Sequence, residues 1–182
     1  MNGCDLLFFS PLNDKEPPEE IHGLYIGGGY PEVFAEELSK NRRMLREIKR
    51  LADDEIPIYA ECGGLLYLSN SIEDERMVGF LPCRAEMSDR NVNFTINEIL
   101  RNTIIGKKGK ILRGHEFHYS RIVEISRDVG FAYRMRRGRG IEKGYDGIVL
   151  KKTLASYTHL HFASDPEIVR NLVNSFEDYA KS

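Results

Sequence analysis

The stretch that most constrains this chain spans residues 56–67, where an isoleucine-rich run ends in Glu61-Cys62-Gly63-Gly64 and passes directly into a leucine-rich segment. This pattern predicts a buried strand, a sharp turn and a helix. A cysteine in such a turn lies at the N-terminus of the helix, where free N–H groups and the helix dipole favour a thiolate and can hold an oxyanion. Cys62 is therefore a candidate nucleophile, although most free cysteines are simply small buried core residues.

The residues before this stretch predict alternating strands and helices. Strands are expected at residues 4–9 and 23–26, and one or two amphipathic helices are expected within residues 32–53. Three glycines, 27–29, follow the second strand and can turn backbone N–H groups into a cleft. Alternation of this kind is typical of an α/β fold with a mostly parallel sheet, whose ligands lie at the carboxyl ends of the strands. The glycine turn and Cys62 both fall at that edge.

After residue 77 the pattern changes to strands and turns, which predicts antiparallel additions to the sheet. Glu116 and His118 share one face of a predicted strand, and His159 and His161 share one face of another, so alternation alone does not choose between the two later histidines. A capping-box pattern at residues 164–167 starts a final structural helix. The predicted segments are 78–82, 92–96, 111–123, an antiparallel pair at 131–135 and 148–150 flanking the basic run 134–139, and 153–162.

Composition narrows the function classes. The 182 residues are 41% hydrophobic and predict a single domain, 1–182. A net charge of −2 from 26 basic and 28 acidic residues predicts neither nucleic-acid binding nor membrane attachment. Three cysteines without a paired spacing and the lack of an apolar span or signal indicate a cytoplasmic protein. No metal site is predicted, because His115-Glu116-Phe117-His118 is one residue short of the spacing that a helical zinc motif needs.

Six blocks in the chain, in this order, resemble the glutaminase (class I, triad-type glutamine amidotransferase) domain of the cobyrinic acid a,c-diamide synthase family. That family includes the Ni-sirohydrochlorin a,c-diamide synthases. The blocks cover nearly the whole chain and are residues 8–12, 23–32, 59–68, 77–82, 113–120 and 155–162. The resemblance implies a class I glutamine amidotransferase-like (flavodoxin-like) fold and hydrolysis of glutamine to glutamate and ammonia through a cysteinyl thioester.

The resemblance also implies roles for particular residues. Cys62 would attack the glutamine amide, and His159 would be its general base, with His161 as the second candidate. The N–H groups of Gly63 and of Gly28 or Gly29 would bind the oxyanion. In many class I amidotransferases a glutamate two residues after the histidine orients it, but that position here is His161. The third member of the triad therefore has to come from elsewhere or be dispensable.

Synthases of this family carry an ATP-binding domain ahead of the glutaminase domain. By this resemblance, the chain is expected to lack that domain and to be shortened at its N-terminus relative to the family's glutaminase domain, so that it either works with a partner chain or is a fragment of a longer gene. ATP and Mg²⁺ are therefore expected only in a partner synthetase, which would present a tetrapyrrole carboxylate, either a corrin or Ni-sirohydrochlorin. Apolar surface left bare by the missing elements could be covered by that partner or by a homo-oligomer. The alternatives are a catalytically silent module on the same fold and a cysteine peptidase or other hydrolase.

Overall fold

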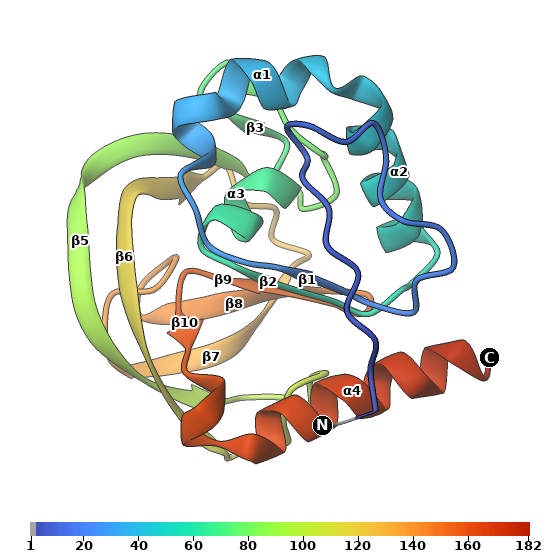
Figure 1. Ribbon diagram of the computed structural model, residues 1–182. Helices are drawn as coiled ribbons and strands as arrows, with labels where there is room; N and C mark the ends of the chain where they lie inside the picture. The colour runs from blue at the N-terminus through green and yellow to red at the C-terminus, as the bar shows by residue number, and fades with distance from the viewer. Residues whose placement is uncertain (1–2) are drawn as a thin grey trace.

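The computed structural model describes residues 3–182 (Figure 1). Its helices are η1 (Pro31–Phe34), α1 (Ala35–Lys40), α2 (Arg42–Asp53), α3 (Gly63–Leu68), η2 (Phe162–Ser164) and α4 (Pro166–Ala180). Its strands are β1 (Leu24–Ile26), β2 (Ile58–Glu61), β3 (Ser71–Ile72), β4 (Glu75–Arg76), β5 (Arg84–Ile99), β6 (Ile111–Val123), β7 (Gly130–Arg137), β8 (Tyr145–Leu150), β9 (Thr153–Ser156) and β10 (His159–Leu160).

The strands form one mixed sheet in the order β1-β2-β9-β8-β7-β5-β3-β4, with β6 paired to β5 and β10 paired to β6. Strands β1, β2 and β9 are parallel, whereas β8, β7 and β5 continue the sheet with antiparallel pairing. The expected parallel core with antiparallel additions is therefore present, and the carboxyl ends of β2 and β9 lie side by side because Glu61 pairs with Ser156.

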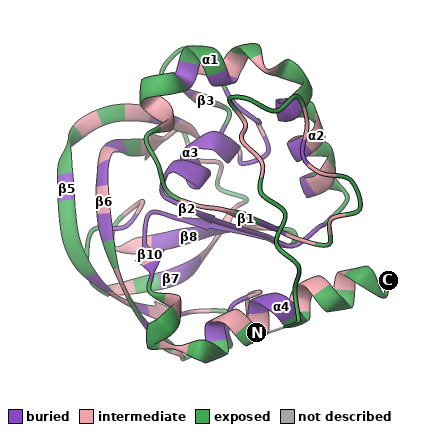
Figure 2. Ribbon diagram, in the orientation of Figure 1, coloured by how far each residue is buried: buried purple, intermediate pink, exposed green. Residues whose placement is uncertain are grey.

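Apolar packing covers both faces of the parallel strands (Figures 1 and 2). Helices α1, α2 and α3 lie on one face and α4 lies on the other. Successive side chains of a strand point to opposite faces, so Ile58 and Ala60 of β2 pack into the cluster with α2 and α3, whereas Tyr59 packs with Ile168 and Leu172 of α4. Strand β2 is buried throughout, which holds the residues that follow it in place.

Strands β5 and β6 form a long curved ribbon that bends away from the sheet (Figure 1). As expected, Glu116 and His118 share a face of β6, and both side chains are buried. Nδ2 of Asn91 donates to Glu116 at 3.0 Å and lies 3.0 Å from Nε2 of His118, while the N–H groups of Arg139 and Gly140 donate to the same carboxylate. This network joins the ribbon to the turn after β7, so it is structural.

Two of the predicted strands are wrong. Residues 4–9 form no strand with any described residue, and Leu6, Leu7 and Phe8 are exposed, since no neighbouring strand pairs with their backbone. Residues 78–82 are buried but irregular, because the N–H groups of Val78 and Leu81 donate to carbonyls at the end of α3 instead of to a strand. The predicted 92–96 strand is the middle of the longer β5, and the prediction for 111–123 matches β6.

The prediction of one continuous strand at 153–162 is also wrong. In the structure β9 ends at Ser156, and a separate short strand, β10, follows. The break arises from Asp146 on β8, which is fully buried and accepts hydrogen bonds from the N–H groups of Tyr157 and Thr158, both at 3.0 Å. Those N–H groups are then not free to pair with a neighbouring strand. Asp146 therefore redirects the chain immediately before His159.

Replacement of Asp146 with alanine is expected to destabilise the protein by about 3 kcal/mol, because three buried N–H groups, including that of Gly147, would lose their acceptor. In a chain of this size the loss corresponds to a fall in Tm of roughly 6–12 °C. Calorimetry measures it, with the exposed Asp128→Ala as the matched control. Equal Tm values for both variants would contradict the structural role of Asp146.

Candidate active site

Cys62 occupies the sharp turn that the sequence predicts between β2 and α3. Its φ of 48° and ψ of −98° place a non-glycine residue in a strained backbone conformation, as is found at nucleophile elbows. The turn is held by hydrogen bonds on both sides: the N–H of Cys62 donates to the carbonyl of Ser156 at 2.7 Å, and its own carbonyl accepts from Leu66 at 3.1 Å. The strain is thus supported by the parallel pairing of β2 and β9.

The surroundings of Cys62 raise the pKa of its thiol, which is opposite to the thiolate that the sequence pattern favours. Burial, together with the nearby Glu32 carboxylate, raises the pKa of Cys62 to about 12, although the N–H of Gly63 acts in the opposite direction. The S–H donates to the carbonyl of Phe117 on β6, with Sγ 3.6 Å from the oxygen. A thiol with a raised pKa needs a base before it can act as a nucleophile.

His159 lies on β10, which places it beside the elbow. Its backbone pairs with His115 of β6, and the two imidazole rings stack with their centroids 4.9 Å apart. Burial lowers the pKa of His159, Glu61 raises it and His115 lowers it further. A half-buried histidine with a lowered pKa is neutral near pH 7 and can accept a proton. His161, the second candidate, is exposed and lies outside β10 at the start of η2.

The glycine turn between β1 and η1 contacts both the elbow and the histidine. A Cβ atom on Gly28 would overlap Cε1 of His159, and one on Gly63 would lie 2.9 Å from the backbone nitrogen of Gly29. None of the three turn glycines adopts the left-handed conformation, and of the three only Gly28 is needed for space, because a Cβ atom on Gly29 would meet no heavy atom within 4 Å. Gly28, Gly29, Gly63, Cys62 and His159 are therefore brought to one end of the sheet.

Sequence reasoning missed Glu61, the residue before the nucleophile. Its side chain is buried, and its Oε2 lies 3.8 Å from Nδ1 of His159. The sequence did contain a signal for Glu61. It is a charged residue in an otherwise apolar strand that is predicted to be buried, and such a residue is rarely found without a partner.

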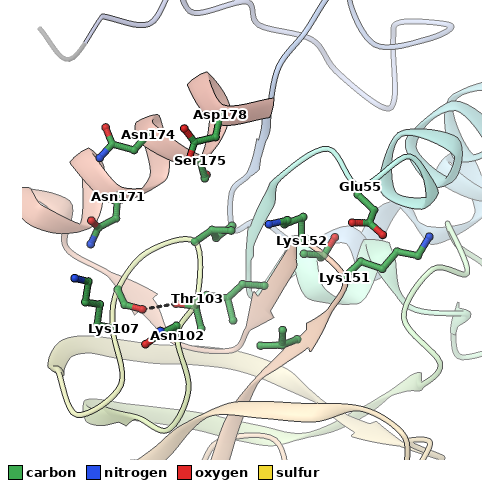
Figure 3. Close-up of a pocket in the computed structure, with 15 residues that line it drawn as sticks. Glu55, Asn102, Thr103, Lys107, Lys151, Lys152, Asn171, Asn174, Ser175 and Asp178 are labelled. Atoms are coloured by element: carbon green, nitrogen blue, oxygen red, sulfur yellow. Dashed lines mark hydrogen bonds between the residues drawn. The ribbon is translucent and has the colours of Figure 1, made fainter. Parts of the chain in front are cut away.

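Two cavities differ in their position relative to this site. A pocket of about 400 Å³ borders the glycine turn and the elbow. A larger cavity of about 540 Å³ lies at the other end of the parallel strands, beside Lys152 and Thr153 at the start of β9 (Figure 3). Ligands of parallel sheets bind at the carboxyl ends, so the smaller pocket is the one associated with the candidate site.

Among residues 3–182, no group of three or more His, Cys, Asp or Glu side chains is arranged to hold a metal ion. No helix of this part is long and apolar enough to cross a membrane.

Solved structures with a similar fold include glutamine amidotransferases. PurLQS from Thermotoga maritima matches 93% of this chain and 84% of its own with a TM-score of 0.64 and 17% identity. A glutamine amidotransferase from the same organism matches 92% of this chain and 69% of its own with a TM-score of 0.56 and 15% identity. The fold is therefore that of the class I glutamine amidotransferases, as expected.

The family follows from the sequence comparison. Residues 2–167 match the model of the CobB/CobQ-like glutamine amidotransferase domain, and the chain belongs to that family. Similar curated proteins are the cobyrinate a,c-diamide synthases of Methanobrevibacter smithii, 43% identical over 96% of this chain, and of Methanocaldococcus jannaschii, 45% identical over 95%. The chain spans only 39% and 38% of the length of these two relatives. The resemblance seen in the sequence is confirmed.

Proposed function

We propose that this chain hydrolyses glutamine at Cys62 and supplies the ammonia for a,c-diamidation of cobyrinate in cobalamin biosynthesis. The observation that carries the proposal is the strained Cys62 elbow, which lies with half-buried His159 and the glycine turn at the carboxyl end of the sheet. The names of the similar synthases favour a corrin acceptor over Ni-sirohydrochlorin.

In the proposed reaction, His159 removes the proton from Sγ of Cys62 as the sulfur attacks the carboxamide carbon of glutamine. The N–H of Gly63 and that of Gly28 or Gly29 stabilise the tetrahedral oxyanion. Collapse of this intermediate breaks the C–N bond, and His159 returns its proton to the leaving ammonia. Water, deprotonated by the same histidine, then cleaves the thioester and releases glutamate.

In our proposal, the ammonia reacts with an acceptor that this chain alone does not bind. The longer relatives contain a further part that this chain does not match, and we assign to that part the use of ATP and Mg²⁺ and the binding of the acceptor carboxylates. The exposed Leu6, Leu7 and Phe8 and the unpaired edge of β1 support docking of such a partner.

Release of glutamate from glutamine tests the proposal. The purified chain should release glutamate at a low rate, and addition of the synthetase part should raise that rate, because closure of the site excludes water. Asparagine, which is one methylene shorter, is the control substrate and should not be hydrolysed appreciably. No glutamate release, even with the synthetase present, would favour a catalytically silent module, and cleavage of peptides instead would favour a peptidase.

A further inference from the structure

We propose that Glu61 positions His159 and is the third member of the catalytic triad, an inference that rests on the proposed glutamine hydrolysis. Glu61 and Cys62 are consecutive, so the carboxylate and the nucleophile come from the same turn. In this arrangement the orienting residue precedes the cysteine instead of following the histidine by two positions, where the exposed His161 stands.

The carboxylate of Glu61 is held from several directions. Its Oε1 accepts hydrogen bonds from the hydroxyl of Tyr59 at 2.7 Å and from the N–H of Leu160 at 2.8 Å. Its Oε2 accepts from the hydroxyl of Tyr25 at 2.9 Å and faces Nδ1 of His159 at 3.8 Å. These three donors satisfy most of the hydrogen-bonding capacity of the buried Glu61 carboxylate, and His159 lies on its remaining side.

The Glu61 carboxylate contacts both the backbone next to His159 and the imidazole ring of His159. Leu160 follows His159 directly, so its hydrogen bond to Glu61 fixes the chain at the base itself. The facing carboxylate favours the tautomer of His159 with the proton on Nδ1, which leaves Nε2 as the basic nitrogen. When His159 takes the proton of Cys62, the imidazolium forms beside a negative charge, and the 3.8 Å contact can shorten to a hydrogen bond.

Glu61→Gln tests this role because glutamine preserves the shape of the side chain and removes the charge. The expected result is a fall in kcat/KM of about 100-fold. Removal of the negative charge also lowers the pKa of His159, so the acidic limb of the pH profile and the NMR titration of the His159 ring both move to lower pH. The other histidines that act on His159, His115 and His118 of β6, are unchanged in this variant.

Tyr25→Phe is the matched control, since it removes a donor to the same Oε2 and keeps the charge. It should leave the titration of His159 nearly unchanged. A folded Glu61→Gln protein with an unaltered His159 titration and near-normal kcat/KM would overturn the inference.

Should Glu61→Gln fail to fold, the nitrogen chemical shifts of His159 in the wild-type chain decide instead. A proton on Nε2 of the neutral ring would overturn the inference, and one on Nδ1 supports it. These NMR measurements do not depend on catalysis. A wild-type chain that hydrolyses no glutamine but shows the expected titrations would therefore refute the proposed function and leave the contact between Glu61 and His159 supported.

Discussion

The Cys62→Ala protein is expected to lose glutamine hydrolysis by roughly 10⁴-fold, to the background rate, while its fold is retained. Only Sγ is removed, and the backbone bonds of the elbow to Ser156 and Leu66 do not depend on the side chain. Without the sulfur no thioester forms, and neither His159 nor the glycine turn can supply a nucleophile. Glutamate release from glutamine measures the loss, and a glutamine-analogue affinity label should modify the wild-type chain and not the variant.

Cys83→Ala is the matched control for this experiment. Cys83 is as deeply buried as Cys62, and burial likewise raises its pKa to about 12, but it lies in the loop before β5. Its replacement should leave glutamate release unchanged apart from a small loss of stability. Hydrolysis that persists in Cys62→Ala, or that is lost equally in Cys83→Ala, would contradict the assignment of the nucleophile.

The second large effect is expected from a single methyl group in the glycine turn. In Gly28→Ala the new Cβ would overlap Cε1 of His159 and lie 3.1 Å from its Nδ1, so the ring has to move. A displacement of about 1 Å at a catalytic base lowers the rate by about 100-fold. The expected result is a fall in kcat of this size with a normal Tm, because the backbone at Gly28 is not left-handed and accepts alanine.

Gly29→Ala separates this steric effect from a general disturbance of the turn. A Cβ atom on Gly29 has no heavy atom within 4 Å, and its N–H is retained in alanine. We therefore expect nearly normal activity. If Gly28→Ala and Gly29→Ala were equally active, the packing of His159 against Gly28 would be irrelevant to catalysis; if they were equally inactive, the turn would act through its backbone mobility.

The elements that could be predicted from sequence are those that local patterns determine. The helical spacing within residues 32–53 predicted α1 and α2, and the apolar run before Cys62 predicted β2 and the elbow. The break between β9 and β10 could not be predicted, because it depends on Asp146, which reaches the N–H groups of Tyr157 and Thr158 from a different strand. A long-range hydrogen bond of this kind leaves no periodic signal.

The features of the candidate site also divide into those that could be predicted from the sequence and those that could not. Cys62 could be found from the turn pattern, and His159 from a resemblance in sequence, but the raised pKa of the thiol could not, because it comes mainly from burial in the folded chain. The packing role of Gly28 also could not be predicted from the sequence, because Gly28 makes room for an imidazole that lies 131 positions later. Proximity between distant segments is a property of the fold.

Cys62 and His159, the proposed nucleophile and base, lie almost one hundred residues apart in the chain, but a short path of contacts joins them. One peptide unit joins Glu61 to Cys62, and the side chain of Glu61 holds both the ring of His159 and the N–H of Leu160. Glu61, at the end of β2, thus links the backbone before Cys62 to the ring of His159 and to the residue after it. A substitution that displaces the Glu61 side chain is therefore expected to displace the ring of His159 as well.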